Sequence, residues 1–201
     1  MKDTVFIVKF SIYGHGRGWC FTPKDFIKLD NPQAVRKALS RLQDIGFINR
    51  IGWGLYEYPR KHEVLGQLPP DIAQVAKALT RGSKIKILPS GAYAANLLGL
   101  SEQVPGKIVY LTDGRSRKIK IGKTELIFRR TTIKNMVAAG TLAGVVIQAL
   151  RHLGKEHVDG PVITKLKKRL SKQDLKLLYK YRLSAPDWLR QIINNIVNEG
   201  D

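Results

Sequence analysis

Cysteine is almost absent from this sequence, which has Cys20 alone among its 201 residues. A single cysteine excludes an intrachain disulfide and a zinc site built on several cysteines, and it is typical of a reducing cytoplasm. Long apolar runs are lacking too. Residues 136–150 are too few and too rich in Gly and Ala to cross a bilayer, and the N-terminus does not resemble a signal peptide. We therefore expect a cytoplasmic protein with no membrane partner.

Acidic residues are scarce, because 16 Asp and Glu stand against 35 Lys and Arg, a formal net charge of +19. The excess is spread along the chain, with +6 over residues 1–62, +8 over 63–149 and +5 over 150–201. A globular protein this basic is expected to bind a polyanion, most commonly nucleic acid. An anionic membrane surface and an acidic protein are the alternatives. Since no single tail accounts for the charge, we expect it to cover more than one structural unit.

Residues suited to catalysis or metal binding are few and scattered. The glycines of Gly14–Gly18 follow no convincing strand and open no long helix, so they predict a turn and not a phosphate-binding loop. No pair of carboxylates suited to acid–base or metal chemistry is visible. The histidines have no metal-ligand spacing; they are His15, His62, His152 and His157. The sequence predicts a protein that is not an enzyme and uses no metal ion or cofactor, although an active site assembled from distant residues stays open.

The N-terminal part has the element order of a winged helix-turn-helix. A helix is expected over residues 4–13 and an extended segment over 19–21. Thr22 and Pro23 then begin a brief helix. Asn31 and Pro32 begin a longer helix that ends at Gly46, with an apolar stripe at helical spacing. Two strands, 47–51 and 54–58, form a hairpin. We predict a DNA-binding domain over residues 1–62.

The helix that begins at Asn31 is the best functional candidate in the sequence. Its polar face carries donors suited to base edges and phosphates in a major groove, namely Gln33, Arg36, Lys37, Ser40 and Arg41. The hairpin is the predicted wing, with Arg50 and Trp53 near its tip and Arg60 and Lys61 after its second strand. A solvated helix face, and a packing role for Trp53, are the alternatives.

Residues 63–201 predict a mixed α/β domain that ends in helices, so that the whole chain belongs to the α+β class. Helices are expected over 71–81, 90–100 and 135–153, with two or three more over 161–198. Strands are expected over 84–88, 107–112, 117–121 and 124–130, with turn residues at Asp113-Gly114 and Gly122.

A second basic surface is predicted on the hairpin of this C-terminal domain. Lys118 and Lys120 alternate with Ile119 and Ile121, as a half-buried strand requires. The full set is Arg115, Arg117, Lys118, Lys120, Lys123, Arg129 and Arg130. RNA, DNA and an acidic protein are possible partners, and an RNA-binding module that acts through this domain is the alternative function. A similar basic run at residues 165–172 is interpreted as a solvated helix face.

Several segments together resemble the AbiEi family of antitoxins from type IV toxin–antitoxin systems. They are GRGWCFTPKDF at 16–26, AVRKALSRL at 34–42, GLYEYPR at 54–60, LPSGAYAANLLGLSEQVPGKIVYLTDG at 88–114, FRRTT at 128–132 and GVVIQALRHLG at 144–154. The resemblance covers most of the chain to about residue 160. The long central segment is the most specific part, since basic winged helices alone are common.

The resemblance implies a repressor that autoregulates its operon by binding inverted repeats of double-stranded operator DNA, as a monomer or a dimer. By position, the recognition helix is 31–46 and the wing is 47–58. It also implies that the C-terminal part counters a nucleotidyltransferase-like toxin without forming a stable complex with it. The expected location is the nucleoid of a prokaryotic cytoplasm. The family transfers no catalytic residue.

Overall fold

The computed structural model describes residues 3–198 and confirms the predicted α+β class. The chain divides into two compact units. The first comprises residues 1–84 together with 119–123, and the second comprises 85–118 and 124–201. The predicted boundary at residue 62 therefore lies inside the first unit. Among the described residues, no helix is long and apolar enough to span a membrane.

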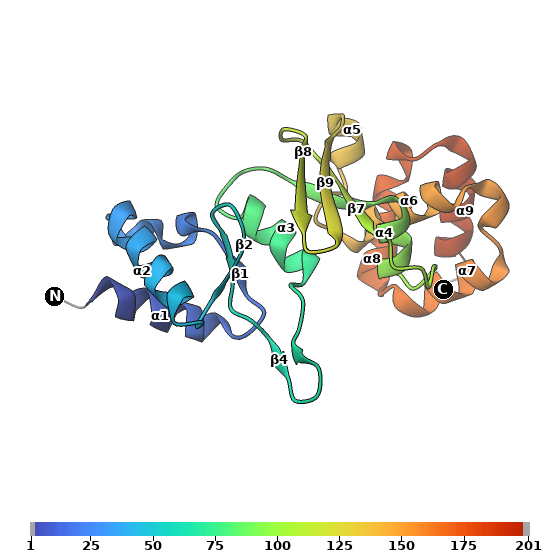
Figure 1. Cartoon of the computed structure of the whole chain (residues 1–201). Coiled ribbons are helices and arrows are strands. Elements are labelled where there is room, and N and C mark those ends of the chain that lie inside the picture. The colour runs from blue at the N-terminus through green and yellow to red at the C-terminus, as the bar shows by residue number, and fades with distance from the viewer. Residues whose placement is uncertain (1–2, 199–201) are drawn as a thin grey trace. The chain divides into compact units, whose positions relative to one another are not determined.

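The first unit begins with helix α1 (Thr4–His15), strand β1 (Cys20–Phe21), the 3-10 helix η1 (Pro23–Leu29) and helix α2 (Pro32–Asp44). Strands β2 (Asn49–Gly52) and β3 (Leu55–Glu57) follow. This is the predicted order, and Figure 1 shows these elements in blue to cyan. The three strands form an antiparallel sheet in the order β1-β3-β2. β3 lies in the middle and pairs with β1 on one edge and with β2 on the other.

Helices α1 and α2 lie side by side and enclose an aromatic core with this sheet. Val8 and Ile12 of α1 and Leu39 of α2 are completely buried. Trp19 and Phe21 stack with their ring centroids 4.6 Å apart. This core explains why such short elements are ordered, since each helix is too short to be stable alone.

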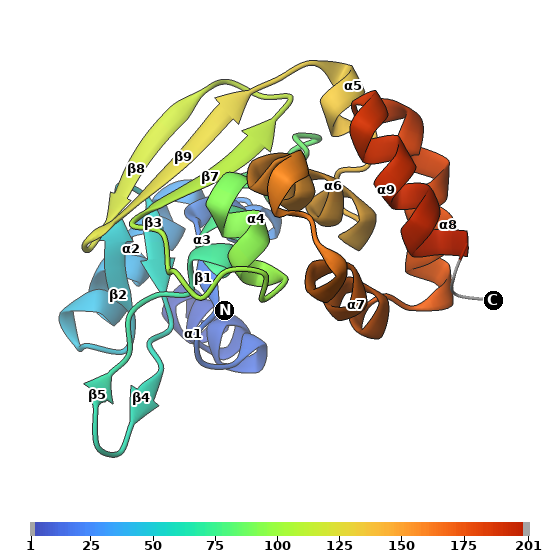
Figure 2. The ribbon, with the colours of Figure 1, turned by 90° about the vertical axis from the view of Figure 1, so that its right-hand side faces the viewer.

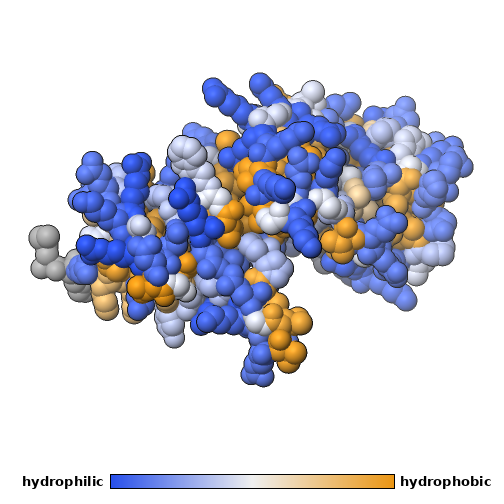
Figure 3. All heavy atoms as spheres, viewed as in Figure 1, coloured by the Kyte–Doolittle hydropathy of each residue, from blue (hydrophilic) through white to orange (hydrophobic). Residues whose placement is uncertain are grey.

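The first unit continues past the predicted boundary because helix α3 (Ile72–Thr80) packs against β1. Just after the helix, Arg81 donates to the carboxylate of Asp25 at 2.8 Å and to the carbonyl oxygen of Cys20 at 3.3 Å. Between β3 and α3 lies a small hairpin that the sequence did not predict, β4 (Lys61–His62) and β5 (Gly66–Gln67). Val64 and Leu65 at its tip are exposed, and Figure 3 shows the tip in orange.

The second unit is built on a four-stranded sheet in the order β6-β7-β9-β8, although residues 119–121 at the end of β8 are grouped with the first unit. The strands are β6 (Ile87–Ser90), β7 (Lys107–Thr112), β8 (Arg117–Ile121) and β9 (Thr124–Arg130). β9 lies between β7 and β8 and runs parallel to β7. The Gly122–Lys123 turn joins β8 to β9, and Gly122 adopts a φ of 57° that suits glycine. Figure 2 shows β7, β9 and β8 side by side.

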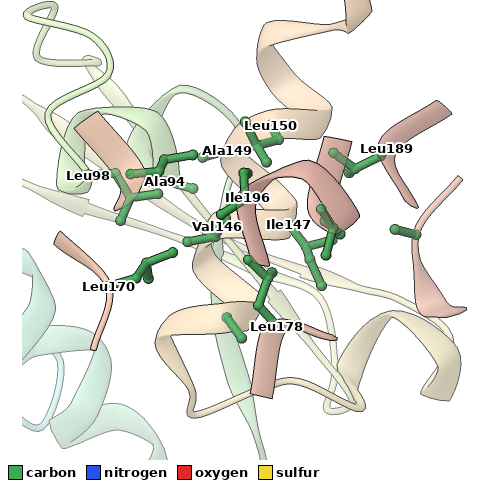
Figure 4. Packing of buried hydrophobic residues seen from close by; sticks show 14 of the residues in the cluster. Ala94, Leu98, Val146, Ile147, Ala149, Leu150, Leu170, Leu178, Leu189 and Ile196 are labelled. Carbon is green, nitrogen blue, oxygen red and sulfur yellow. The ribbon is translucent and has the colours of Figure 1, made fainter. Parts of the chain in front are cut away.

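Helices supply the main hydrophobic core of the second unit (Figure 4). They are α4 (Gly91–Leu97), α6 (Leu142–Leu153), α7 (Gly160–Arg169), α8 (Lys172–Tyr181) and α9 (Asp187–Asn198), with short 3-10 turns at Lys155–His157 and Arg182–Ser184. The short helix α5 (Ile133–Met136) contributes Met136 to a smaller cluster with Leu88 and Leu111. The predicted single helix over 135–153 is wrong. It is divided between α5 and α6, because Gly140 has a φ of 83° and the Thr141 side chain caps α6.

Candidate nucleic-acid interface

Helix α2 is held in place by its cap and by its buried stripe. The Asn31 side chain accepts a hydrogen bond from the Ala34 amide at 2.9 Å, and Pro32 occupies the first turn. The buried stripe consists of Val35, Ala38, Leu39 and Leu42. Because this stripe faces the core, the rotation of the helix is set and its opposite side must face solvent.

The exposed side of α2 carries the predicted polar set. Gln33, Arg36, Lys37, Ser40 and Arg41 are all exposed, and their spacing places them on one helix face. Within residues 3–198, none of these five side chains makes a hydrogen bond or an ion pair. Hydrophilic atoms cover the region of α2 in Figure 3. The predicted face is thus gathered on one surface and is free to bind a partner.

The β2–β3 hairpin presents Trp53 to solvent, with 94% of its surface exposed. This exposure does not support the alternative packing role for Trp53. Arg50, also exposed, donates from Nε to the carbonyl oxygen of Gly52 at 3.3 Å. The pairing of β2 with β3 shifts register between Arg50 and Gly52, and Gly54 adopts a φ of 59°. The tip is therefore a tight, irregular turn that displays one cation and one large aromatic ring.

Arg60 lies apart from these residues because its guanidinium is engaged elsewhere. Its Nη2 donates to the carbonyl oxygen of Pro69 at 3.1 Å, and its stem packs against Gly18. Arg60 also lines a cavity of about 220 Å³ together with His15, Arg17, Gly18, Trp19, Asp71 and Gln74. Lys61 is exposed on β4. The structure thus engages the Arg60 guanidinium with the segment around Pro69 and not with the hairpin tip.

Lys24 is a cation near α2 that the sequence reasoning missed. It lines an apolar groove of about 150 Å³ with Phe26, Ile27 and Arg36, between η1 and α2. Lys24 and Lys28 are both exposed on η1. The threonine and proline that begin η1 were recognised in the sequence, but only the packing of η1 against α2 brings Lys24 beside Arg36.

A buried carboxyl group lies behind the hairpin. Glu57 is completely buried on β3, and across the described residues neither of its carboxylate oxygens has a hydrogen-bond partner. Burial raises the pKa of Glu57, and Arg60 partly opposes this effect. On the neighbouring strand, burial and then the charge of Glu57 raise the pKa of the Cys20 thiol to about 12. A thiol in this environment stays protonated and unreactive.

Only some of the residues predicted for the second basic surface lie together in the structure. Arg117, Lys118 and Arg129 line a groove of about 590 Å³ on the sheet of the second unit. Arg115, Lys120, Lys123 and Arg130 are exposed but do not line this groove. Lys107 does line it, although the sequence reasoning did not single it out. Burial lowers the pKa of Arg117, which nevertheless remains a cation at neutral pH.

No cluster of three or more His, Cys, Asp or Glu side chains suited to a metal ion occurs in the part of the chain that the structure describes. His15 is engaged in packing, because its ring stacks on Trp19 with centroids 3.8 Å apart. The surfaces described above offer positive charge and hydrogen-bond donors as their main chemistry.

Comparison with known proteins gives a family without an assigned function. Residues 8–178 match a model described as a family of unknown function, DUF6088. No protein with a curated description matches the chain. The crystal structure of the RV2827C protein from Mycobacterium tuberculosis is similar to 98% of this chain and to 76% of that chain, with 13% sequence identity and a TM-score of 0.47.

Proposed function

We propose that this chain, which belongs to the DUF6088 family, binds double-stranded DNA through its first unit, in the manner of a winged helix-turn-helix. The observation that carries the proposal is the outward face of α2, where five side chains have no partner among residues 3–198. Three of the five are cations, and the other two are Gln33 and Ser40. Arg and Gln are suited to the edges of guanine and adenine in the major groove, and Lys is suited to phosphate.

Residues around α2 support the same proposal. Lys24 and Lys28 precede the helix on η1 and offer further phosphate contacts. The β2–β3 hairpin, with Arg50 and Trp53 exposed, serves as the wing that follows the DNA backbone or enters a minor groove. Asp44 is exposed at the end of α2, and its negative charge would repel phosphate, so the proposed DNA contact ends before this residue.

The proposal includes regulation, for which the resemblance to AbiEi antitoxins is the support. In this proposal the chain represses its own operon by binding inverted repeats, as a monomer or a dimer, in a prokaryotic cytoplasm. The second unit counters a nucleotidyltransferase-like toxin without a stable complex. The proposal assigns the chain no catalysis and no cofactor.

Binding to the DNA upstream of its own gene tests the proposal. The full chain is titrated against this duplex and against a scrambled duplex over a salt series. Substitution of an arginine that reads a base, Arg36→Ala or Arg41→Ala, is expected to weaken specific binding by about 1–3 kcal/mol and to relax specificity at one position. Loss of a phosphate contact through Lys37→Ala is expected to weaken both duplexes equally and to lower the salt slope by about 0.9.

Lys77→Ala is the matched control for Lys37→Ala, because Lys77 is also exposed but lies on α3 of the same unit. This control is expected to bind like the unaltered chain. The proposal fails if Arg36→Ala, Lys37→Ala and Arg41→Ala all bind DNA like the control. It also fails if the native and scrambled duplexes are bound equally at every salt concentration, since net charge alone would then explain the association.

A further inference from the structure

The groove on the sheet of the second unit has the size of a ligand pocket, and strand pairing sets the positions of its lining residues. Its volume is about 590 Å³, within the range of about 300–1,000 Å³ that is common for ligand pockets. Pairing of β7 with β9 puts Lys107 opposite Glu125 and Val109 opposite Ile127. Because side chains alternate along a strand, these four lie on the same face of the sheet, and Arg129 follows them on β9.

The floor of this groove is apolar, and its rim is basic. Val109 and Ile127 are half-buried and line the groove. Lys107, Lys118 and Arg129 also line it; all three are exposed, and within residues 3–198 their side chains make no hydrogen bond or ion pair. An apolar strip edged by unpaired cations is suited to a ligand with flat apolar faces and repeated negative charges.

Two further residues in the lining add to this chemistry. The Arg117 guanidinium lies over the Phe128 ring, 4.5 Å from its centroid, and thus presents a planar cation. Such a plane is a surface on which nucleic-acid bases stack. Glu125 is half-buried in the lining and is an acceptor without a donor among the described residues. A carboxylate repels phosphate but accepts hydrogen bonds from the amino groups of bases.

We propose that this groove binds single-stranded nucleic acid, with bases on Val109 and Ile127 and phosphates on Lys107, Lys118 and Arg129. A duplex does not fit this chemistry, because its bases are stacked inside and its outer surface offers phosphates without apolar faces. Unstacked bases of a single strand reach the floor, and each base that covers its apolar surface adds to the affinity. The site is separate from α2 and does not depend on the function proposed for the first unit.

The test uses the full chain and fluorescein-labelled strands of mixed sequence and about 12 nucleotides, a length typical of single-strand sites. RNA, DNA and duplex DNA are compared by fluorescence anisotropy over a salt series. The double variant Lys118→Ala/Arg129→Ala is expected to bind single strands about tenfold more weakly, with a salt slope lower by about 1.4, since each lost phosphate contact contributes about 0.7. The RNA and DNA arms distinguish which strand the groove prefers.

The matched control is Lys168→Ala/Arg169→Ala, which removes the same charge from exposed positions on α7 of the same unit. The control is expected to bind single strands like the unaltered chain. Crosslinks from 4-thiouridine in the RNA strand are expected on peptides of β7 or β9. The variant Arg36→Ala/Arg41→Ala, which alters only α2, is expected to keep single-strand binding.

Three results would overturn the proposal. The first is equal single-strand affinity of the groove variant and its α7 control. The second is crosslinking confined to peptides of the first unit. The third is competition by polyglutamate as effective as that by RNA at the same salt concentration, which would indicate an acidic protein as the partner. A failure of duplex binding by the first unit leaves all three measurements interpretable.

Discussion

Glu57 makes the stability of the first unit dependent on pH in a predictable direction. Burial raises the pKa of its carboxyl group above the value of about 4.3 that an unfolded chain has. The folded chain therefore holds this proton more tightly than the unfolded chain does. The resulting stabilisation is fully present below pH 4 and is lost as the pH rises through the raised pKa of the folded state. We expect the first unit to become less stable as the pH rises above about 4.3.

Glu57→Gln removes the ionisation and keeps the shape of the side chain. A buried charged acceptor without a donor costs about 1–3 kcal/mol, and a neutral amide in the same place also lacks ideal partners. We therefore expect the variant to be about 1–2 kcal/mol more stable than the unaltered chain at pH 8. At pH 4, where both side chains are neutral, the difference in the free energy of unfolding should be close to zero.

Hydrogen exchange measured on peptides of β1 and β3 reports the stability of this region without assuming that the two units unfold together. Glu63→Gln is the control, because Glu63 is an exposed glutamate of the same unit. Its pH profile should match that of the unaltered chain. The reasoning is refuted if Glu57→Gln destabilises β1 and β3 at pH 8, since the carboxylate would then be ionised and compensated in the folded state.

Three other substitutions or treatments follow from packing. Gly144→Ala should destabilise the second unit by about 3 kcal/mol in urea unfolding, because the added methyl would meet the carbonyl oxygen of Ala138, whereas Gly160→Ala, with no atom nearby, should be close to neutral. Cys20 should resist iodoacetamide in the native chain and react fully in urea, since its pKa is about 12; fast native labelling would contradict this. Ser171→Ala should lower stability by about 1 kcal/mol in the same urea assay, because it removes the cap of α8, and an unchanged midpoint would argue against that cap.

Local signals in the sequence were sufficient to predict the part of the candidate site that lies on the single helix α2. Asn31 and Pro32 mark the start of α2, and the apolar stripe sets its rotation, so the exposed face was predictable residue by residue. The turn residues around Trp53 likewise predicted the hairpin. These features depend on contacts between near neighbours, and such contacts are readable from spacing alone.

The long helix predicted over 135–153 shows where local reasoning fails. Its apolar residues have helical spacing, but Gly140 and the Thr141 cap divide it. The first compact unit extends beyond the predicted boundary at residue 62 for another reason. Arg81 bonds to Asp25 and to the backbone of Cys20, which are far away in the sequence, so α3 belongs to the first unit.

Composition and short-range periodicity were enough to predict the α+β class, the charge of the chain and the exposed face of α2. The folded structure was needed to show that β9 lies parallel to β7, which places Lys107 and Val109 beside Glu125 and Ile127 in one groove. It also decided that Arg60 turns to Pro69 and away from the hairpin tip. Strand order and the pairing of distant side chains depend on long-range packing, which no spacing within one segment reveals.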